Sequence, residues 1–529
     1  MTEKGNKVKS EVQISLKSSA VPKDIDNNLV PFAEKQLRLA PGTITELEIT
    51  SKSIDSRKAP PLLVYRAVVT IPDSCKGKFQ EYSGKKAAAV IPENVWRHSE
   101  SPVIVGTGPA GLFAGLYLAL AGAKPLILDR GFPVAERDER YKKFLAGRKL
   151  DTESNLLIGE GGAGTFSDGK LYTGTKSPFA RTVIEEFISA GAPQEIGYLS
   201  RPHIGSDYLK RAIPALRERI ISLGGTFRFN SKVEDIMVKD GVCTGVVLAG
   251  GEKISTSAGV ILACGLGGRE LVRKVISKVD YALKSFQLGC RIEHPQEFID
   301  LKQYKMSRPE ALSAAEYHIV SRPANAPGVS SFCMCPGGRV VNATAWENAS
   351  ITNGVSDFAR DGKFANSCLI STVTLPESFR LDDVYAMMEQ VEREQFIRGG
   401  SDYAFPCQSA EDFLRRRATV KVGDHSCETG IVPGRIDDLL PKDSFAALAA
   451  ALKHFDKLMP GFIKYGKFIG VESCVSSPVR LLRDENCESS VKKLYPAGEG
   501  PGLAGGIISA ACDGMRCAEN LLKRSVNNG

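Results

Sequence analysis

The feature that most constrains the fold is one segment, VIVGTGPAGLFAGLYLALAGAKPLILDR, at residues 103–130. Val103–Val105 is short and apolar and predicts a buried strand, whereas Leu112–Leu120 predicts a helix. Pro125–Leu128 predicts a second strand, which ends at Asp129. Doubly wound α/β sheets are built from a unit that consists of a strand, a glycine turn, a helix and a parallel strand. The segment therefore predicts an α/β domain with a parallel sheet.

The glycines of this segment follow the G-x-G-x-x-G pattern of a Rossmann-type dinucleotide site. Gly106 allows the tight turn, Gly108 lets a pyrophosphate approach the backbone, and Gly111 lets the helix pack closely on the strand. The helix N-terminus offers free N–H groups to phosphates. Asp129 is placed to accept hydrogen bonds from an adenosine ribose. The predicted contacts here also include Pro109, Ala110 and Arg130.

Composition and charge are those of a globular protein of two or three domains. The chain has 529 residues, of which 43% are hydrophobic and 25% charged. It has neither a long apolar run for a membrane span nor a secretory signal. Thirteen scattered cysteines favour a reducing compartment, so we expect a cytoplasmic protein. The net charge of +8 comes without a dense basic block, so nucleic-acid binding is not required.

The order of patterns along the chain predicts a discontinuous cofactor domain. Residues 1–97 predict a small N-terminal α/β module, with strands at Val12–Leu16 and Leu63–Ile71 and a helix at Val30–Leu39. We assign 98–284 and 466–529 to the two parts of the cofactor domain, and 285–465 to an inserted mixed α+β substrate domain. Further helices are expected at 207–223, with a kink at its proline, and at 381–396, 437–457 and 507–522.

Four further stretches are suited to contact a dinucleotide. The glycine-rich loop GEGGAGTFSDGKL, at 159–171, has a backbone able to approach a phosphate or a flat ring. A strand beginning at Val233 can meet an adenine, and small residues end another strand at 263–265. The turn at 498–507 carries a glutamate and opens the last helix. The predicted contacts are Gly162, Ala163, Gly164, Thr165, Val233, Ala263, Cys264, Gly265, Gly498, Glu499, Gly505, Gly506 and Ile507.

These stretches together resemble a known family. The motifs GEGGAGTFSDGKL, RPHIGSDYL, LGCRIEHP, FCMCPGG, SSPVR and LYPAGEGPGLAGGIISAACDG are similar to those of the uncharacterised FAD-dependent dehydrogenases of bacteria and plastids, which are flavoproteins of the type with two dinucleotide-binding domains. The resemblance covers nearly the whole chain and implies non-covalent FAD, with Asp129 on the ADP half, Glu499 on the ribitol side and Gly505–Ile507 near the pyrimidine end. The family's usual Glu-Thr-Arg-Thr before SSPVR is replaced by residues 472–475, ESCV, so this chain lacks the arginine that a shared contact to an anionic substrate would use.

The candidate catalytic residues are Arg291, His294 and Arg480. Arg291 either forms a structural ion pair with Glu293 or faces the substrate, and His294 is a general acid or base or a structural histidine. Arg480 is a candidate to reach the flavin or the substrate. His203, like His294, is either a general acid or base or a structural histidine. No metal-binding spacing of ligands is present.

The Cys333-Met334-Cys335 motif leaves two interpretations open. It is either a redox-active pair beside the flavin or a set of buried or cavity-lining thiols. Only Arg339 stands near it in the sequence to lower the pKa of a thiol.

The function expected from these features is an FAD-dependent oxidoreductase that moves hydride between flavin and a small organic substrate. A second complete G-x-G-x-x-G unit is missing, so NAD(P)H is expected only as a transient donor at the flavin. The alternatives are a flavin-dependent monooxygenase, an RNA-modifying flavoprotein and a non-catalytic flavin-binding protein. The sequence does not decide the oligomeric state.

Overall fold

A parallel sheet of five strands forms the centre of the cofactor-type domain. The computed structural model describes residues 7–75, 82, 84, 88–324 and 326–527. The strand order is β22 (Leu494–Pro496), β10 (Val260–Leu262), β4 (Val103–Val105), β5 (Leu126–Leu128) and β6 (Thr226–Arg228), with every neighbouring pair parallel. Because β22 comes from the C-terminal part of the chain, the domain is discontinuous. The predicted fold class is confirmed.

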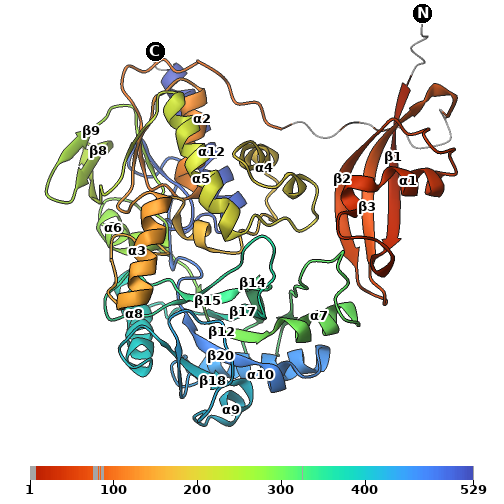
Figure 1. The fold of residues 1–529 in the computed structure, drawn as a ribbon. Helices are drawn as coiled ribbons and strands as arrows, with labels where there is room; N and C mark the ends of the chain where they lie inside the picture. Colours follow the sequence, from red (N-terminus) through yellow and green to blue (C-terminus); the bar gives the residue numbers. More distant parts are fainter. Residues whose placement is uncertain (1–6, 76–81, 83, 85–87, 325, 528–529) are drawn as a thin grey trace, which may run out of the picture.

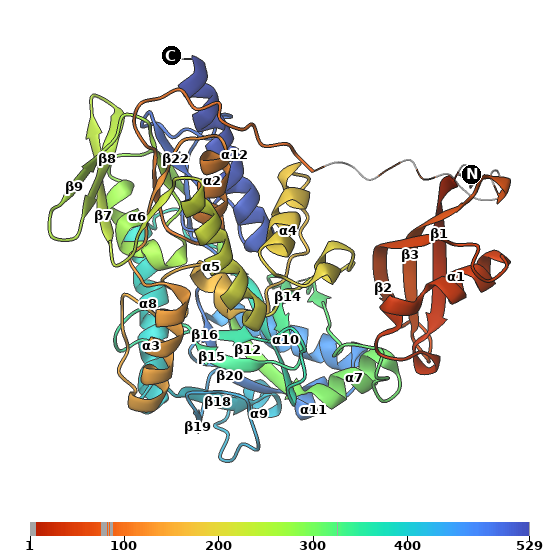
Figure 2. The ribbon, with the colours of Figure 1, turned by 45° about the horizontal axis from the view of Figure 1, so that its top comes forward.

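Helices α2 (Pro109–Leu120), α5 (Ser206–Ser222) and α12 (Ile507–Asn527) lie side by side over this sheet (Figures 1 and 2). Their apolar side chains form one buried cluster with α4 (Phe179–Ser189). Gly514 of α12 is pressed against α2, since a Cβ atom there would lie 1.9 Å from the carbonyl oxygen of Ala110. Helix α5 continues through Pro214, where a kink was expected.

The remaining elements of this domain surround the sheet. The helices α3 (Val134–Gly147) and α6 (Arg269–Val275), and the 3-10 turns η4 (Gly162–Phe166), η5 (Gln194–Gly197) and η6 (Leu266–Gly268), join its strands. A separate antiparallel sheet consists of β7 (Val233–Lys239), β8 (Val242–Leu248) and β9 (Lys253–Ser255). A two-stranded sheet pairs β11 (Tyr281–Leu283) with β21 (Val479–Leu481).

A mixed sheet of seven strands makes up most of the inserted region. Its order is β13 (Val320–Ser321), β14 (Val329–Cys335), β17 (Phe364–Val373), β12 (Phe286–Pro295), β20 (Lys467–Glu472), β18 (Phe405–Ser409) and β19 (Ile431–Pro433). The helices of this region are α7 (Gln296–Tyr304), α8 (Leu381–Arg398), α9 (Ala410–Arg415), α10 (Lys442–Leu458) and α11 (Phe462–Tyr465). The hairpin of β15 (Arg339–Asn342) and β16 (Thr352–Val355) forms a separate two-stranded sheet.

One predicted boundary needs correction, while the others stay predictions. β20 falls in the segment 466–529 that we expected in the cofactor domain, but it pairs with β12 and β18 in the seven-stranded sheet. The apolar run of β20 fits there because it closes the gap between two strands that would otherwise have open hydrogen-bonding edges. The expected helix 437–457 also begins later, at Lys442, directly after Pro441.

The N-terminal module stands to one side of the molecule (Figures 1 and 2). It is an antiparallel sheet of β1 (Lys7–Lys17), β3 (Leu62–Pro72) and β2 (Glu46–Asp55), in that order, covered by α1 (Val30–Leu37) and the 3-10 turns η1 (Ser18–Ala20), η2 (Ile25–Asn28) and η3 (Asp73–Cys75). Its strand β2 exchanges backbone hydrogen bonds with the segment 198–200. Among the described residues, no helix is long and apolar enough to cross a membrane.

Candidate FAD-binding cavity

A cavity of about 1090 Å³ opens at the carboxyl ends of the parallel strands. This edge is where doubly wound sheets bind their ligands, and the volume lies just above the range of about 300–1,000 Å³ for drug-sized ligands. Its walls come from the glycine turn after β4, the loop 157–164, η6, the start of α12, and β14 and β16 of the inserted region. All predicted cofactor contacts line it except Gly111 and Thr165.

The three glycines of the G-x-G-x-x-G turn have different roles. Gly106 has a φ of 104°, and a Cβ atom there would lie 2.3 Å from the Ala263 carbonyl oxygen. At Gly111, a Cβ atom would lie 1.9 Å from the carbonyl oxygen of Gly106. Gly108 has an ordinary φ of −64°, and a Cβ atom would meet nothing within 4 Å. Gly106 and Gly111 therefore serve the fold, whereas Gly108 leaves room in the cavity.

Asp129 holds the glycine turn in place. Its side chain is 7% exposed and accepts hydrogen bonds from the Thr107 N–H at 2.9 Å, from the Thr107 hydroxyl and from the Gly131 N–H at 2.8 Å. A carboxylate can accept about four hydrogen bonds, so these three leave acceptor capacity on a residue that lines the cavity. The neighbouring Arg130 lines the same end and is held by Glu153 at 2.6 and 2.8 Å and by Glu270 at 3.0 Å.

Sequence reasoning missed the residue that shapes the glycine-rich loop. Arg137 of α3 is 0% exposed and donates to the backbone carbonyl oxygens of Asn155, Glu160 and Gly162. Burial lowers its pKa to about 10. Gly159 must lack a side chain here, since a Cβ atom would lie 2.5 Å from Cδ of Arg137. The only sequence signal was one arginine in a charged helix, which does not distinguish it from its solvated neighbours.

A second ion pair fixes the turn at the other end of the cavity. Asp513 of α12 accepts a hydrogen bond from the Gly498 N–H at 2.9 Å and is paired with Arg483. This holds Glu499 at the cavity wall, where one of its oxygens accepts from the Ser477 N–H at 3.0 Å. Burial raises the pKa of Glu499. The next turn ends at Gly506, whose φ of 80° aims the start of α12 at the cavity.

Arg291 lies behind the cavity wall and does not line it. It is 0% exposed, donates to Glu472 from Nε at 3.1 Å and from Nη2 at 2.5 Å, and donates to Asn366 at 2.7 Å. Its partner Glu472 does line the cavity. The expected choice between a pair with Glu293 and a substrate contact is thus corrected: Arg291 pairs with Glu472 and positions it.

His294 and Arg480 are not brought to the cavity, which corrects both predictions. His294 is 0% exposed, its Nε2 lies 2.8 Å from the Phe462 carbonyl oxygen, and burial lowers its pKa to about 4. Arg480 is exposed on β21. His203 is also structural, since its Nε2 lies 3.0 Å from the Phe358 carbonyl oxygen. The sequence identified these residues as candidates, but it did not indicate which side of each strand faces the cavity.

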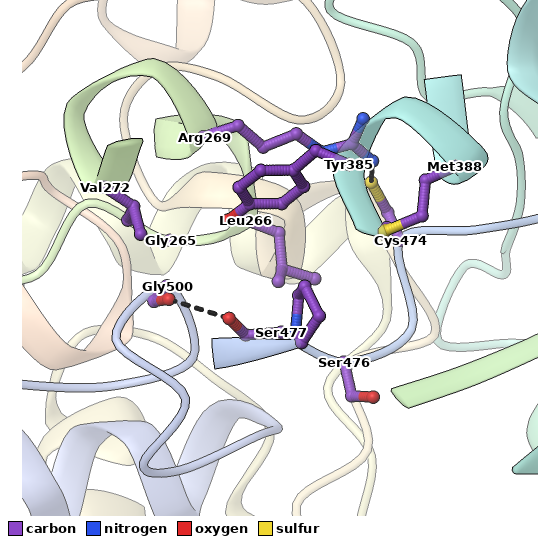
Figure 3. A pocket seen from close by; sticks show the side chains of 11 residues that line it. Gly265, Leu266, Arg269, Val272, Tyr385, Met388, Cys474, Ser476, Ser477 and Gly500 are labelled. Atoms are coloured by element: carbon purple, nitrogen blue, oxygen red, sulfur yellow. Dashed lines mark hydrogen bonds between the residues drawn. The ribbon is translucent and has the colours of Figure 1, made fainter. Parts of the chain in front are cut away.

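A small pocket beside the cavity marks the junction with the inserted region (Figure 3). Arg269 of α6 forms a buried pair with Glu392 of α8 at 2.7 and 2.9 Å, and its guanidinium lies 4.1 Å from the ring of Trp346. The same guanidinium contacts the thiol of Cys474 at 3.1 Å. Ser477 donates to the Gly500 carbonyl oxygen at 3.0 Å, as the dashed line shows. These contacts fasten the inserted region to the rim of the cavity.

The end of the cavity formed by the inserted region carries polar and ionisable side chains. They are Lys170, Tyr172, Arg201, Gln287, His318, Cys333, Asn353 and Glu472. Within the described part of the chain, no group of three or more His, Cys, Asp or Glu side chains is placed to hold a metal ion.

Comparison with known proteins shows what the chain is similar to. Residues 285–474 match the family described as "FAD-dependent protein, C-terminal domain-like". An uncharacterised protein of Clostridium beijerinckii is 39% identical over 512 residues, which span 93% of this chain and 95% of that protein.

Among solved structures, a variant of the quinol fumarate reductase FrdA from E. coli shares 12% identity and has a TM-score of 0.36. The matched part covers 81% of this chain and 71% of that one. Glycine oxidase from Geobacillus kaustophilus shares 12% identity over 80% of this chain and 94% of its own, with a TM-score of 0.35. The 39% identity over 93% of the chain shows that the protein belongs to the same family as the Clostridium protein, and residues 285–474 are similar to the C-terminal domain-like family of FAD-dependent proteins.

Proposed function

We propose that the protein is an FAD-dependent oxidoreductase that holds FAD non-covalently in the cavity and acts on a small organic substrate. The observation that carries the proposal is the empty space over Gly108. A side chain there would enter a cavity bounded by the starts of α2 and α12, although the fold itself would tolerate one. This is the arrangement expected where a pyrophosphate approaches the backbone.

The residues at each end of the cavity suit the two halves of the cofactor. Toward the adenine half we place Asp129, Arg130 and Val233, and toward the ribitol we place Glu499. The N–H groups at Gly506 and Ile507 open α12 beside the expected flavin ring, where a helix N-terminus favours negative charge. When bound, FAD supplies two-electron hydride chemistry, while the chain binds, orients and encloses it.

The substrate is expected at the inserted region's end of the cavity. Lys170 and Arg201 give this end positive charge, and Glu472 gives it a carboxylate whose pKa burial raises. Because Arg291 holds Glu472 from behind, this carboxylate has a fixed position at the wall. Reduced nicotinamide would act as a transient hydride donor at the flavin. A cytoplasmic location fits the free thiols, because that compartment keeps thiols reduced.

The test is to purify the full chain and record its visible spectrum. A yellow protein that retains FAD through gel filtration, and is bleached anaerobically by NADH or NADPH, is the expected result. Protein that stays colourless and cannot be reconstituted with FAD would contradict the proposal. Oxygen-dependent consumption of NAD(P)H coupled to product would instead point to a monooxygenase, and tight, salt-sensitive RNA binding to an RNA-modifying flavoprotein.

A further inference from the structure

Two cysteines of β14 stand at the substrate end of the cavity. Cys333 lines the cavity, whereas Cys335 is fully buried behind it. Both are free thiols, and the Sγ of Cys335 donates to the backbone carbonyl oxygen of Cys333 at 3.3 Å. One thiol of the pair is thus reachable from the cavity, and the other is shielded.

The backbone between them departs from a regular strand. In a regular strand, residues two apart are separated by about 6.6 Å between Cα atoms, near the upper limit for a disulfide. Here the pairing of β14 with β17 shifts between Phe332 and Cys335, and Cys333 has a φ of 46°. A left-handed cysteine in a bulge is strained, and such strain gathers at functional sites.

Room for the second thiol is also provided. Gly354 of β16 faces the pair, and a Cβ atom there would lie 2.8 Å from Sγ of Cys335 and 2.5 Å from Nη1 of Arg291. The same arginine donates to the carbonyl oxygen of Cys333 at 3.5 Å. The thiol pair is therefore built into the wall together with the Arg291–Glu472 ion pair.

The charges around the pair favour one thiolate. The neighbouring Cys335 thiol lowers the pKa of Cys333; Lys170 and Arg291 act in the same direction, while burial and Glu472 oppose them. The pKa of Cys335 is raised by the neighbouring Cys333 and by burial. Lys170 is held close by bonds to Asp168 and to the Met334 carbonyl oxygen. Arg339, the only cation that the sequence suggested, is instead paired with Glu428.

We propose that Cys333 and Cys335 form a dithiol that exchanges two electrons with the bound flavin. This rests on the proposed function, because the electrons go to or come from FAD. In the oxidising direction the Cys333 thiolate and the Cys335 thiol form an S–S bond. Their two electrons and the Cys335 proton pass to FAD, giving the anionic reduced flavin, so charge and atoms balance. The reverse step breaks the S–S bond and restores thiolate and thiol.

The experiment is an anaerobic dithionite titration of the oxidised holoprotein, followed by its visible spectrum. The expected uptake is four electrons per flavin, two for the flavin and two for the disulfide, with a long-wavelength thiolate–flavin absorbance after the first two. Cys333→Ser should take up two electrons and lack that absorbance. Cys487→Ser is the matched control, since Cys487 also lies beside a second cysteine, Cys517, but neither lines the cavity. It should take up four electrons, like the wild type.

A thiol count gives a readout that does not depend on the variants. Denatured oxidised holoprotein should show two fewer reactive thiols than the reduced form, with a disulfide mapped by mass spectrometry to the peptide holding Cys333 and Cys335. Wild-type protein that binds FAD but takes up only two electrons, with all thiols free, overturns the dithiol and leaves the proposed function standing. Protein that binds no FAD contradicts the proposed function, while disulfide mapping of the oxidised apoprotein still tests the pair.

Discussion

Substitutions in the glycine turn can change cofactor binding and the stability of the fold separately. At Gly108 an added Cβ atom meets nothing within 4 Å, and the φ of −64° suits any residue. Gly108→Ala should therefore leave the apoprotein as stable as the wild type, or stabilise it by about 0.4–1 kcal/mol through the unfolded chain. The new methyl group enters the cavity, where overpacking against a bound pyrophosphate costs about 1–3 kcal/mol. That cost corresponds to roughly a 5- to 150-fold loss of FAD affinity.

Gly111→Ala should behave in the opposite way. Its Cβ atom would lie 1.9 Å from the Gly106 carbonyl oxygen, so α2 must move away from the turn. We expect the apoprotein to lose at least about 1–3 kcal/mol of unfolding free energy. Gly147→Ala is the matched control, because its position is also open but lies at the end of α3, away from the cavity.

The assay has two parts, urea unfolding of each apoprotein and titration of each with FAD followed by flavin fluorescence. Only Gly108→Ala should weaken FAD binding without lowering the unfolding free energy of the apoprotein. If Gly108→Ala binds FAD as tightly as Gly147→Ala does, the pyrophosphate is not over Gly108 and the placement of the cofactor is refuted.

Three further predictions concern residues that hold the cavity or the inserted region. Arg137→Met should remove about 3 kcal/mol or more of unfolding free energy, since the carbonyl oxygens of three loop residues lose the buried arginine as a donor. Hydrogen exchange should then become faster in the loop 159–166, and unchanged exchange contradicts this. Gly514→Ala should destabilise the protein by about 1–3 kcal/mol by separating α12 from α2, and a melting temperature equal to that of the wild type counts against the close packing. Burial lowers the pKa of His294 to about 4, so between pH 6.5 and about 4 the unfolded chain binds a proton at this histidine and the folded protein does not. The wild type should therefore lose on the order of 3 kcal/mol of unfolding free energy as the pH falls through this window. In urea unfolding, His294→Gln should lack this part of the acid sensitivity, and a variant with the wild-type pH dependence shows that His294 is not its source.

The sequence was sufficient for the parts of the fold whose local chemistry is distinctive. The turn after β4 was predictable because glycine spacing, an apolar strand and an apolar helix all agree there. The turn before α12 was predictable for the same reason. Helix α2 begins at Pro109 and not at Leu112, since proline is favoured in the first helical turn.

Side chains that act over long sequence separations were not predictable. Alternation along β12 placed Arg291 on one side and His294 on the other, but it did not say what covers each side. That depends on Glu472 of β20 and on Phe462 of α11, which lie 181 and 168 residues further along the chain. The thiol pair was visible in the sequence, but the cations beside Cys333 come from a distant loop and from β12.

The place of β22 in the parallel sheet makes the cavity depend on two distant parts of the chain. β22 pairs directly with β10, and α12 packs on α2. The wall that carries Gly498 and Ile507 therefore exists only once this segment has docked on the strand and helix around the first glycine turn. A chain in which β22 and α12 have not docked has half a cavity and leaves the apolar faces of β10 and α2 exposed to aggregation.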